Sequence, residues 1–232
     1  MKAGILCAVE RELAPFLPHI EGRETSKKAL LSFHAGRIHG VDVVVFLSGV
    51  CKTNAAIAAQ IAIDTYGVDI MINAGTAGGM QEDVALFDTI IGTEVVHHDV
   101  AEAILTAFHP YLSSAYFKAD EKLLALSKEA LKALPPTYVV RYGRMVSGEQ
   151  FITDEGRDVI NAKFEPLTVD METASVAQVC HANEIPFIAI RAVTDTADHS
   201  GADNFEKNCE AASAISKDVV LALLKEIGTA AF

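Results

Sequence analysis

Three acidic side chains stand where an apolar, strand-like run of the sequence gives way to a more polar one. Glu12 and Glu172 come shortly after such a run, and Asp195 comes at the end of another. Carboxyl groups can transfer protons, and as carboxylates they accept hydrogen bonds from sugar hydroxyls. In open α/β sheets, ligands bind beyond the carboxyl ends of the strands, so acids at three such ends can share one crevice.

Each acid taken singly has a simpler explanation. An acidic residue in the first turn of a helix interacts favourably with the helix dipole, so it can serve stability alone. Glu172 begins a helical pattern, and we therefore expect it to stay ionised beside unpaired backbone N–H groups. The coincidence of three such acids favours a shared site over three separate stabilising contacts.

A glycine-rich stretch supplies a second candidate binding element. Residues 74–79 read Ala-Gly-Thr-Ala-Gly-Gly and follow an apolar run. Glycines let backbone N–H groups approach a ligand closely, which makes Thr76, Ala77 and Gly78 candidate binding residues. The stretch is not a phosphate-binding P-loop, because no Lys-Ser/Thr follows it. On spacing alone, a plain tight turn is the favoured explanation.

Two further stretches carry side chains that could bind a ligand or a metal. Phe151 lies in a loop-like segment, where it can stack on a flat heterocycle while the backbone of Ile152 pairs with the ring edge; taken alone, it would be a core residue. His97, His98 and Asp99 suggest a metal, but adjacent side chains on a strand point to opposite faces and no further ligand has helpful spacing. We therefore predict neither a metal nor a cofactor.

Size and composition limit the class of protein. The chain has 232 residues, of which 50% are hydrophobic and 22% charged, and we predict a single domain over residues 1–232. The formal net charge of −12 argues against nucleic acid or an anionic membrane surface as a partner. The first residues show no export signal and the apolar runs are too short to span a bilayer, so we expect a cytoplasmic protein. The four cysteines lack a Cys-x-x-Cys pair, which favours reduced thiols.

The order of the expected elements defines the fold class. Apolar runs and helical periodicity alternate along the chain, which predicts an α/β protein with three layers, α/β/α, around a mixed central sheet. Thr53 is expected to cap a helix that Gly67 ends. Strands are predicted at residues 2–9, 30–38, 41–47, 69–73, 87–96, 138–145 and 185–193, and helices at residues 10–17, 53–66, 119–134, 172–183 and 205–227, with 30–38 and 41–47 forming an antiparallel hairpin.

Five segments together resemble the 5′-methylthioadenosine/S-adenosylhomocysteine nucleosidase family of the purine nucleoside phosphorylase-like superfamily. They occur in the family's order, and the likeness covers nearly the whole chain. The segments are residues 4–12, 73–79 (Asn-Ala-Gly-Thr-Ala-Gly-Gly), 146–152 (Val-Ser-Gly-Glu-Gln-Phe-Ile), 169–174 (Val-Asp-Met-Glu-Thr-Ala) and 191–195 (Arg-Ala-Val-Thr-Asp).

The resemblance implies a phosphorylase/hydrolase-like fold and an enzyme that hydrolyses the N-glycosidic bond of adenine nucleosides. The implied substrates are 5′-methylthioadenosine, S-adenosylhomocysteine and 5′-deoxyadenosine, and the products are adenine and a 5-substituted ribose. Such an activity serves methionine salvage and removes by-products of methyl transfer. Bond cleavage builds positive charge on the ribose and negative charge on the departing base, so acids on both sides of the bond suit it.

The resemblance also assigns roles. Asp195 is implied as the general acid that protonates adenine N7, which requires a pKa raised by burial. Glu12 is implied as the base that orients and deprotonates water. Glu172 and Met171 would hold the ribose, with Glu172 accepting from the 2′ and 3′ hydroxyls. Arg191 would steady Glu172 or the water.

The remaining implied contacts concern the base and the 5′ group. Phe151 and Ile152 would hold adenine, and Phe205 would close the pocket. The chain departs from the family between residues 98 and 117, where residues 99–105 intervene before Thr-Ala-Phe. A small insertion restores the register and makes Phe108 the counterpart of the aromatic residue beside the 5′ substituent. In relatives this segment reaches into the neighbouring subunit's pocket, which implies a homodimer.

The sequence leaves other functions open. A phosphorylase of the same superfamily needs cations for phosphate, whereas Glu12 would repel the anion; Arg11 is the exception, and we interpret it as a solvated charge on a helix face, about 100° away from Glu12. Aminodeoxyfutalosine is an alternative substrate, because relatives cleave it. A nucleoside-binding module without activity is disfavoured, because an acid-base set has no evident purpose in binding alone.

Overall fold

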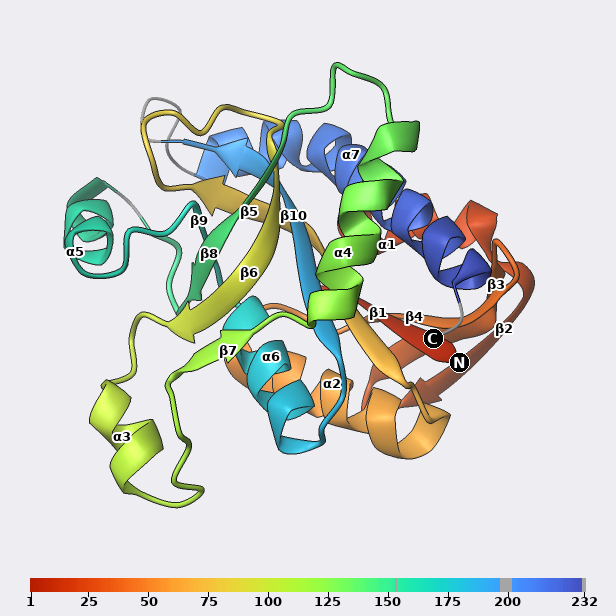
Figure 1. Cartoon of the computed structure of the whole chain (residues 1–232), viewed down its shortest axis with the longest axis horizontal. Helices are drawn as coiled ribbons and strands as arrows, with labels where there is room; N and C mark the ends of the chain where they lie inside the picture. The colour runs from red at the N-terminus through yellow and green to blue at the C-terminus, as the bar shows by residue number, and fades with distance from the viewer. Residues whose placement is uncertain (153, 197–201, 231–232) are drawn as a thin grey trace.

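A mixed β-sheet runs through the molecule, with helices on both of its faces (Figure 1). The computed structural model describes residues 1–152, 154–196 and 202–230. The strands are β1 (Lys2–Cys7), β2 (Glu21–Lys28), β3 (Leu31–Ile38), β4 (Val41–Leu47), β5 (Ile70–Gly79), β6 (Thr89–His97), β7 (Tyr116–Lys118), β8 (Val140–Ser147), β9 (Thr168–Asp170) and β10 (Phe187–Asp195).

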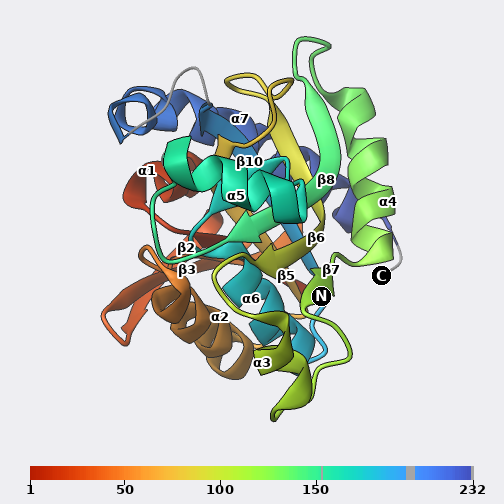
Figure 2. The same ribbon diagram turned by 90° about the vertical axis from the view of Figure 1, so that its left-hand side faces the viewer.

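The helices pack as two layers. In the described part of the chain they are α1 (Glu10–Leu13), α2 (Lys52–Tyr66), α3 (Glu102–Ala107), α4 (Glu121–Ala130), α5 (Asp154–Phe164), α6 (Thr173–Ala182) and α7 (Ala202–Thr229), with 3₁₀ turns at Ala14–His19 and Leu131–Ala133. Helices α4 and α7 cover one face of the sheet, and α2 and α6 cover the other (Figures 1 and 2). The predicted α/β/α fold with a mixed sheet is confirmed.

The sheet closes on itself near the site. Strand β5 pairs in parallel with both β1 and β10, while β10 also pairs with β6. Because β6 pairs with β8, β8 with β9, and β9 with β5, these strands form a small ring, and β1, β4, β3 and β2 extend from it. The closure brings β9 beside the carboxyl end of β5, although a long stretch of sequence separates them.

Burial explains why the strands were predictable in the centre and not at the edge. Residues of β1 from Ala3 to Cys7 are fully buried between two apolar clusters, so the sequence there is continuously apolar. Strand β2 was not predicted, because every residue in it is exposed and polar. It pairs only with β3 at the edge, where charged residues are typical and protect against aggregation.

Three local predictions need correction. Residues 74–79 do not form a turn: they continue β5, because their backbone pairs with β10 and β9. The predicted first helix is a single α-turn followed by a 3₁₀ turn that contains two prolines. Helix α2 starts from Cys51 and not from a Thr53 cap, while Gly67 ends it in the left-handed conformation as predicted. Of the helices in the described part of the chain, none has the length and apolar character that a bilayer span requires.

Candidate active site

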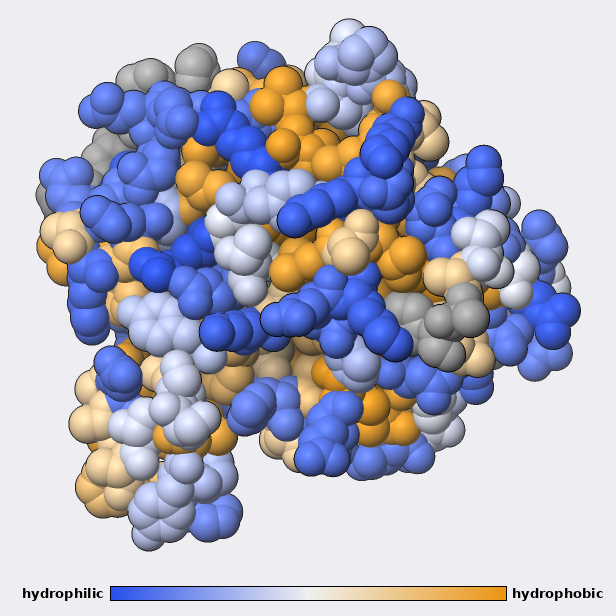
Figure 3. Space-filling view, viewed as in Figure 1, coloured by the Kyte–Doolittle hydropathy of each residue, from blue (hydrophilic) through white to orange (hydrophobic). Residues whose placement is uncertain are grey.

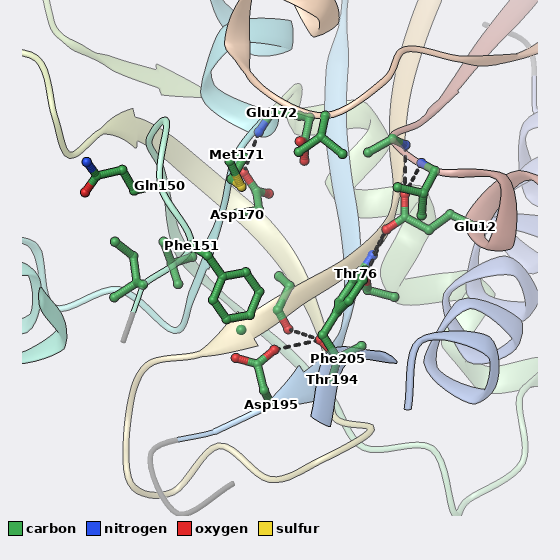
Figure 4. Close-up of a pocket in the computed structure, with 17 residues that line it drawn as sticks. Glu12, Thr76, Gln150, Phe151, Asp170, Met171, Glu172, Thr194, Asp195 and Phe205 are labelled. Carbon is green, nitrogen blue, oxygen red and sulfur yellow. Dashed lines mark hydrogen bonds between the residues drawn. The ribbon is translucent and has the colours of Figure 1, made fainter. Parts of the chain in front are cut away.

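A cavity of about 220 Å³ opens beyond the carboxyl ends of β1, β5 and β10, beside β9 (Figure 4). Segments that are far apart in the sequence meet there, as the positions of the three acids led us to expect. Of the residues predicted for the site, those that line the cavity are Glu12, Thr76, Ala77, Gly78, Phe151, Ile152, Met171, Glu172, Asp195 and Phe205. Arg191 lies behind this wall, and Phe108 is not part of it.

Glu12 is held by donors on both of its oxygens. Its Oε2 accepts from the backbone N–H groups of Ala8 (2.8 Å) and Val9 (3.3 Å). Its Oε1 accepts from the N–H (2.7 Å) and the hydroxyl (2.8 Å) of Thr76. The side chain is 3% exposed, so these bonds fix its direction at the cavity wall. The N–H of Thr76 therefore orients Glu12, whereas the sequence suggested that it would meet a ligand.

Arg191 sits at the centre of an ion cluster. Its guanidinium is fully buried and donates through Nε to Asp170 (3.0 Å) and through Nη2 to Glu172 (2.8 Å), while Nη1 lies 3.7 Å from Oε1 of Glu12. Among the described residues, Nη1 has no hydrogen-bond partner. One cation thus faces three carboxylates, which leaves the cluster with excess negative charge beside the cavity.

Gly75 makes this close approach possible. Its φ is +147°, and a Cβ built on it would lie 2.4 Å from the carboxyl carbon of Glu12 and 2.6 Å from Nη1 of Arg191. Any other residue would push Glu12 and Arg191 apart. The glycine-rich segment therefore makes room for side chains of the site, and Gly78 does the same for Asp195, whose Oδ2 lies 2.9 Å from the Cβ position.

Glu172 is held by two elements other than its own helix. Its Oε1 accepts from the N–H of Cys51 (3.0 Å) at the start of α2, and its Oε2 accepts from Arg191. The first N–H groups of α6 are taken by Asp170, whose Oδ1 accepts from Glu172 (3.1 Å) and Thr173 (3.0 Å). The prediction that Glu172 would meet unpaired amides of its own helix was wrong, because the N–H groups of Thr173 and Ala174 donate to Asp170 and Ser147 instead.

Asp195 and two aromatic side chains form the other end of the cavity. Asp195 is 3% exposed, and its Oδ1 accepts from the hydroxyl of Thr194 at 2.8 Å. Phe151 and Phe205 meet edge to face across the opening, with ring centroids 6.5 Å apart and an interplanar angle of 75°. In Figure 4, Glu12 and Asp195 lie at opposite ends of the group of lining residues, and Phe151 and Phe205 lie near Asp195.

The comparison with known proteins identifies the family. The model of the phosphorylase superfamily matches residues 2–225. A 5′-methylthioadenosine/S-adenosylhomocysteine nucleosidase of Bacillus velezensis is 37% identical over 235 residues, which cover 98% of this chain and 100% of that protein. The chain belongs to this nucleosidase family. The resemblance carried by the five segments is thereby confirmed.

Solved structures agree with this membership of the nucleosidase family. The nucleosidase of Neisseria meningitidis in complex with methylthio-immucillin-A has a TM-score of 0.89 and 33% identity, covering 97% of this chain and 98% of that one. The native structure of futalosine hydrolase from Helicobacter pylori has a TM-score of 0.88 and 27% identity, covering 97% and 98%. The two proteins thus share the fold of this chain, and their names give different substrates.

Burial changes the protonation of two acids of this nucleosidase fold. Desolvation is the main reason why the pKa of Glu172 rises to about 7; the charges of Asp170 and Glu12 add to the rise, and Arg191 opposes it. The expectation that Glu172 stays fully ionised is therefore wrong near neutral pH. Burial also raises the pKa of Asp195, as expected, while Thr194 and Arg157 oppose that rise.

Asp170 is the site residue that sequence reasoning missed. Burial alone would raise its pKa, but Arg191 and the hydroxyls of Ser147 and Thr173 outweigh burial and lower it. It thus stays charged and, from the cavity wall, holds Arg191 through the bond from Nε. The signal that could have found it is its position two and three residues before the amides it accepts from, which is typical of an Asp that starts a helix.

Phe108 is not brought to the cavity. It follows α3, is 62% exposed, and lies on an arm that projects from the body of the molecule (Figures 1 and 3). Phe108 therefore does not line the pocket of its own chain. Its expected contact with a neighbouring subunit stays a prediction.

His97 and Asp99 have partners other than a metal. His97 Nε2 lies 3.0 Å from Oε1 of Gln178, and Asp99 binds Nζ of Lys52 at 2.7 and 2.8 Å. Over residues 1–152, 154–196 and 202–230, no group of three or more metal-binding side chains is found. The ion pair of Asp99 with Lys52 joins the segment after β6 to the start of α2.

Proposed function

We propose that this chain hydrolyses the N-glycosidic bond of 5′-methylthioadenosine and S-adenosylhomocysteine, releasing adenine and the 5-substituted ribose. The observation that carries the proposal is the convergence of Glu12, Glu172 and Asp195 on one cavity. Acids at opposite ends of a cavity suit a reaction that needs a proton at the leaving base and a base at the water. The names of the relatives agree with it.

Asp195 supplies the proton to the leaving group. Its raised pKa keeps the carboxyl protonated at higher pH than an ordinary aspartic acid, so it can donate to N7 of adenine. Protonation draws the electron pair of the bond between C1′ and N9 into the base. Phe151 and Phe205 flank this end of the cavity and give the adenine ring an apolar environment.

Glu12 activates the water that attacks C1′. Four hydrogen bonds hold the carboxylate in one direction, and the longest of them, from Val9 at 3.3 Å, gives way when the carboxylate takes a proton from water as the new C–O bond forms. Nη1 of Arg191, which has no partner among the described residues, faces the same carboxylate and can help to hold that water. The proton from water ends on Glu12, and the adenine leaves with the proton of Asp195.

Glu172 grips the sugar. Each of its oxygens already accepts one hydrogen bond, from Cys51 and from Arg191, and each keeps a lone pair for a ribose hydroxyl. In its ionised form, Glu172 also stabilises the positive charge that develops on the ribose ring. Met171 lines the same part of the cavity and covers the sugar.

Hydrolysis is favoured over phosphorolysis by the cavity wall. Among the described residues that line it, none is a lysine or an arginine. Arg191 already faces three carboxylates, and Arg11 is directed to Glu206 on the surface. A phosphate ion would therefore meet excess negative charge without a free cation.

One assay separates the candidates. Purified protein is incubated with 5′-methylthioadenosine in phosphate-free buffer, and adenine release is followed; S-adenosylhomocysteine and aminodeoxyfutalosine are run in parallel. Release without phosphate supports hydrolysis, whereas release only after phosphate is added, with ribose 1-phosphate as product, makes the protein a phosphorylase. Faster cleavage of aminodeoxyfutalosine would reassign the substrate. No release in any condition would contradict the proposal.

Asp195→Asn tests the general acid. The amide keeps the shape and removes the proton, so kcat should fall by about 10²- to 10⁴-fold. Binding of a transition-state-like inhibitor, measured by calorimetry, should persist and show that the pocket is intact. Full activity in this variant would remove Asp195 from its role.

The homodimer is part of the proposal. The arm around α3 exposes Ile104 (54%), Phe108 (62%) and Tyr111 (68%), and large apolar groups gathered on a projecting segment favour a protein partner. Light scattering should give twice the monomer mass, and Phe108→Ser should shift it toward the monomer. A cytoplasmic location belongs to the same proposal, because the substrates arise from intracellular methyl transfer.

A further inference from the structure

Arg11 is paired with a residue nearly two hundred positions away in the sequence. Its Nη1 donates to the backbone carbonyl of Glu206 (3.1 Å), and its Nη2 donates to the carboxylate of the same residue. The side chains are 45% and 58% exposed, so this contact lies on the surface. Arg11 is thus a surface charge on a helix, as we interpreted it from the sequence, and it also binds the first turn of α7.

Each partner stands next to a residue of the cavity. Arg11 precedes Glu12 in α1, and Glu206 follows Phe205 in α7. The contact therefore joins the short helix that carries the proposed base to the turn that carries one of the two rings at the cavity mouth. Helix α1 also packs directly on α7, so a shift in the position of one helix changes the packing of the other.

The start of α7 contacts both β10 and α1. Asn208 donates from Nδ2 to the carbonyl of Thr194 (2.9 Å) and is buried, which ties α7 to β10. The contact of Arg11 ties the same turn to α1, and it is the exposed one of the two. Phe205 lies before both ties and packs edge to face on Phe151, so its position depends on how this turn is held.

We propose that Arg11 and Glu206 form a latch that holds Phe205 across the mouth of the cavity and so sets the affinity for substrate. Arg11 is a positioning residue here, since it contacts the turn and not the ligand. The inference rests on the proposed function only in that Phe205 borders the substrate. Opening the latch loosens one wall of the pocket and leaves Glu12 and Asp195 with all their hydrogen-bond donors.

The expected effect is modest and falls on binding. An exposed ion pair that also reaches a backbone carbonyl changes an equilibrium by about two- to fivefold. KM should therefore rise by about two- to fivefold in Arg11→Gln, while kcat stays within about twofold. Glu206→Gln keeps the carbonyl acceptor and should give a smaller rise.

A charge exchange provides the rescue. The double variant Arg11→Glu with Glu206→Arg restores opposite charges across the same gap, so its KM should lie closer to the wild type than that of Arg11→Glu alone. Arg37→Gln is the matched control, because Arg37 forms a similarly exposed pair with Asp42 on β3 and β4, away from the cavity. Its KM should not change.

Hydrogen exchange tests the latch without turnover. Amides at the start of α7 should exchange faster in Arg11→Gln than in the wild type, while those of β10 should not change. If the wild type released no adenine, the proposed function would fail and this measurement would still judge the latch. Unchanged exchange, an unchanged KM in Arg11→Gln, or a loss confined to kcat would each overturn the inference.

Discussion

Two arginines bind carboxylates near the cavity, and they do so in opposite surroundings. Arg191 is fully buried among Glu12, Asp170 and Glu172, whereas Arg11 lies on the surface and binds Glu206. A buried charge that loses its partner is left in a poor solvent, while an exposed charge is rehydrated. Loss of the buried arginine–carboxylate contacts should therefore strongly destabilise the fold, whereas loss of the exposed pair should have only a small effect.

The largest effect should come from Arg191. Arg191→Met leaves three buried carboxylates without a cation, and the free energy of unfolding should fall by about 3–5 kcal/mol. Arg191→Lys keeps one charge without the fork that reaches two acids, so it should lose less. Urea denaturation measures both, and Arg11→Gln serves as the control with an unchanged midpoint. Equal midpoints for the two arginines would break the comparison.

Gly75 tests whether the buried cluster depends on close packing. Gly75→Ala adds a Cβ onto Glu12 and Arg191 at a φ of +147°, so stability should fall by about 2–4 kcal/mol and activity should fall with it. Gly40→Ala is the control, since its φ is +80° but no atom lies within 4 Å of the added Cβ. It should cost only the backbone strain, about 1–2 kcal/mol, and leave activity unchanged. Equal costs would mean that crowding at Glu12 is unimportant.

The pH dependence of stability should report on Glu172, which belongs to the buried cluster around Arg191. The pKa of Glu172 is raised by burial to about 7, so in the folded state it keeps a proton that the unfolded chain has lost above its ordinary pKa. Its contribution to stability is present below that ordinary value and is lost as pH rises through about 7. The stability of the wild type relative to Glu172→Gln should therefore decline over this window, by on the order of 2–3 kcal/mol.

This decline is measured by urea denaturation of both proteins at several pH values from about 4.5 to about 8. The amide does not titrate, so the difference between the two proteins isolates Glu172 from other groups. A flat difference would show that Glu172 is ionised throughout, with Arg191 compensating for its burial. That result would support the prediction, made from the sequence, that Glu172 stays ionised.

The smallest effect should be the response to salt. Raising the ionic strength from about 0.05 M to about 0.5 M screens exposed pairs and leaves buried ones nearly unchanged. The KM of the wild type should rise by up to about twofold, and that of Arg11→Gln should respond less, while the unfolding cost of Arg191→Met should stay the same at both salt concentrations. An equal salt response in wild type and Arg11→Gln would show that the salt dependence of KM does not come from the exposed pair.

Sequence patterns predicted the central elements and failed at the edges and at the cluster. Buried strands such as β1 and β10 are continuously apolar, so their positions were readable. Strand β2 carries no apolar pattern, since no face of it is buried. The glycines of residues 74–79 indicated a close approach, but only the paired strands showed that side chains of the site, and not a ligand, fill that space.

The acids at the ends of three apolar runs, the family and the class of reaction were determined by the sequence, because residue type and local spacing are written there directly. Which donor holds which carboxylate was decided by the tertiary structure. Cys51 and Arg191 meet Glu172 only after the sheet has closed, and Arg11 meets Glu206 only after α7 has packed on α1. Burial and partnership depend on contacts between distant segments, and no local pattern records them.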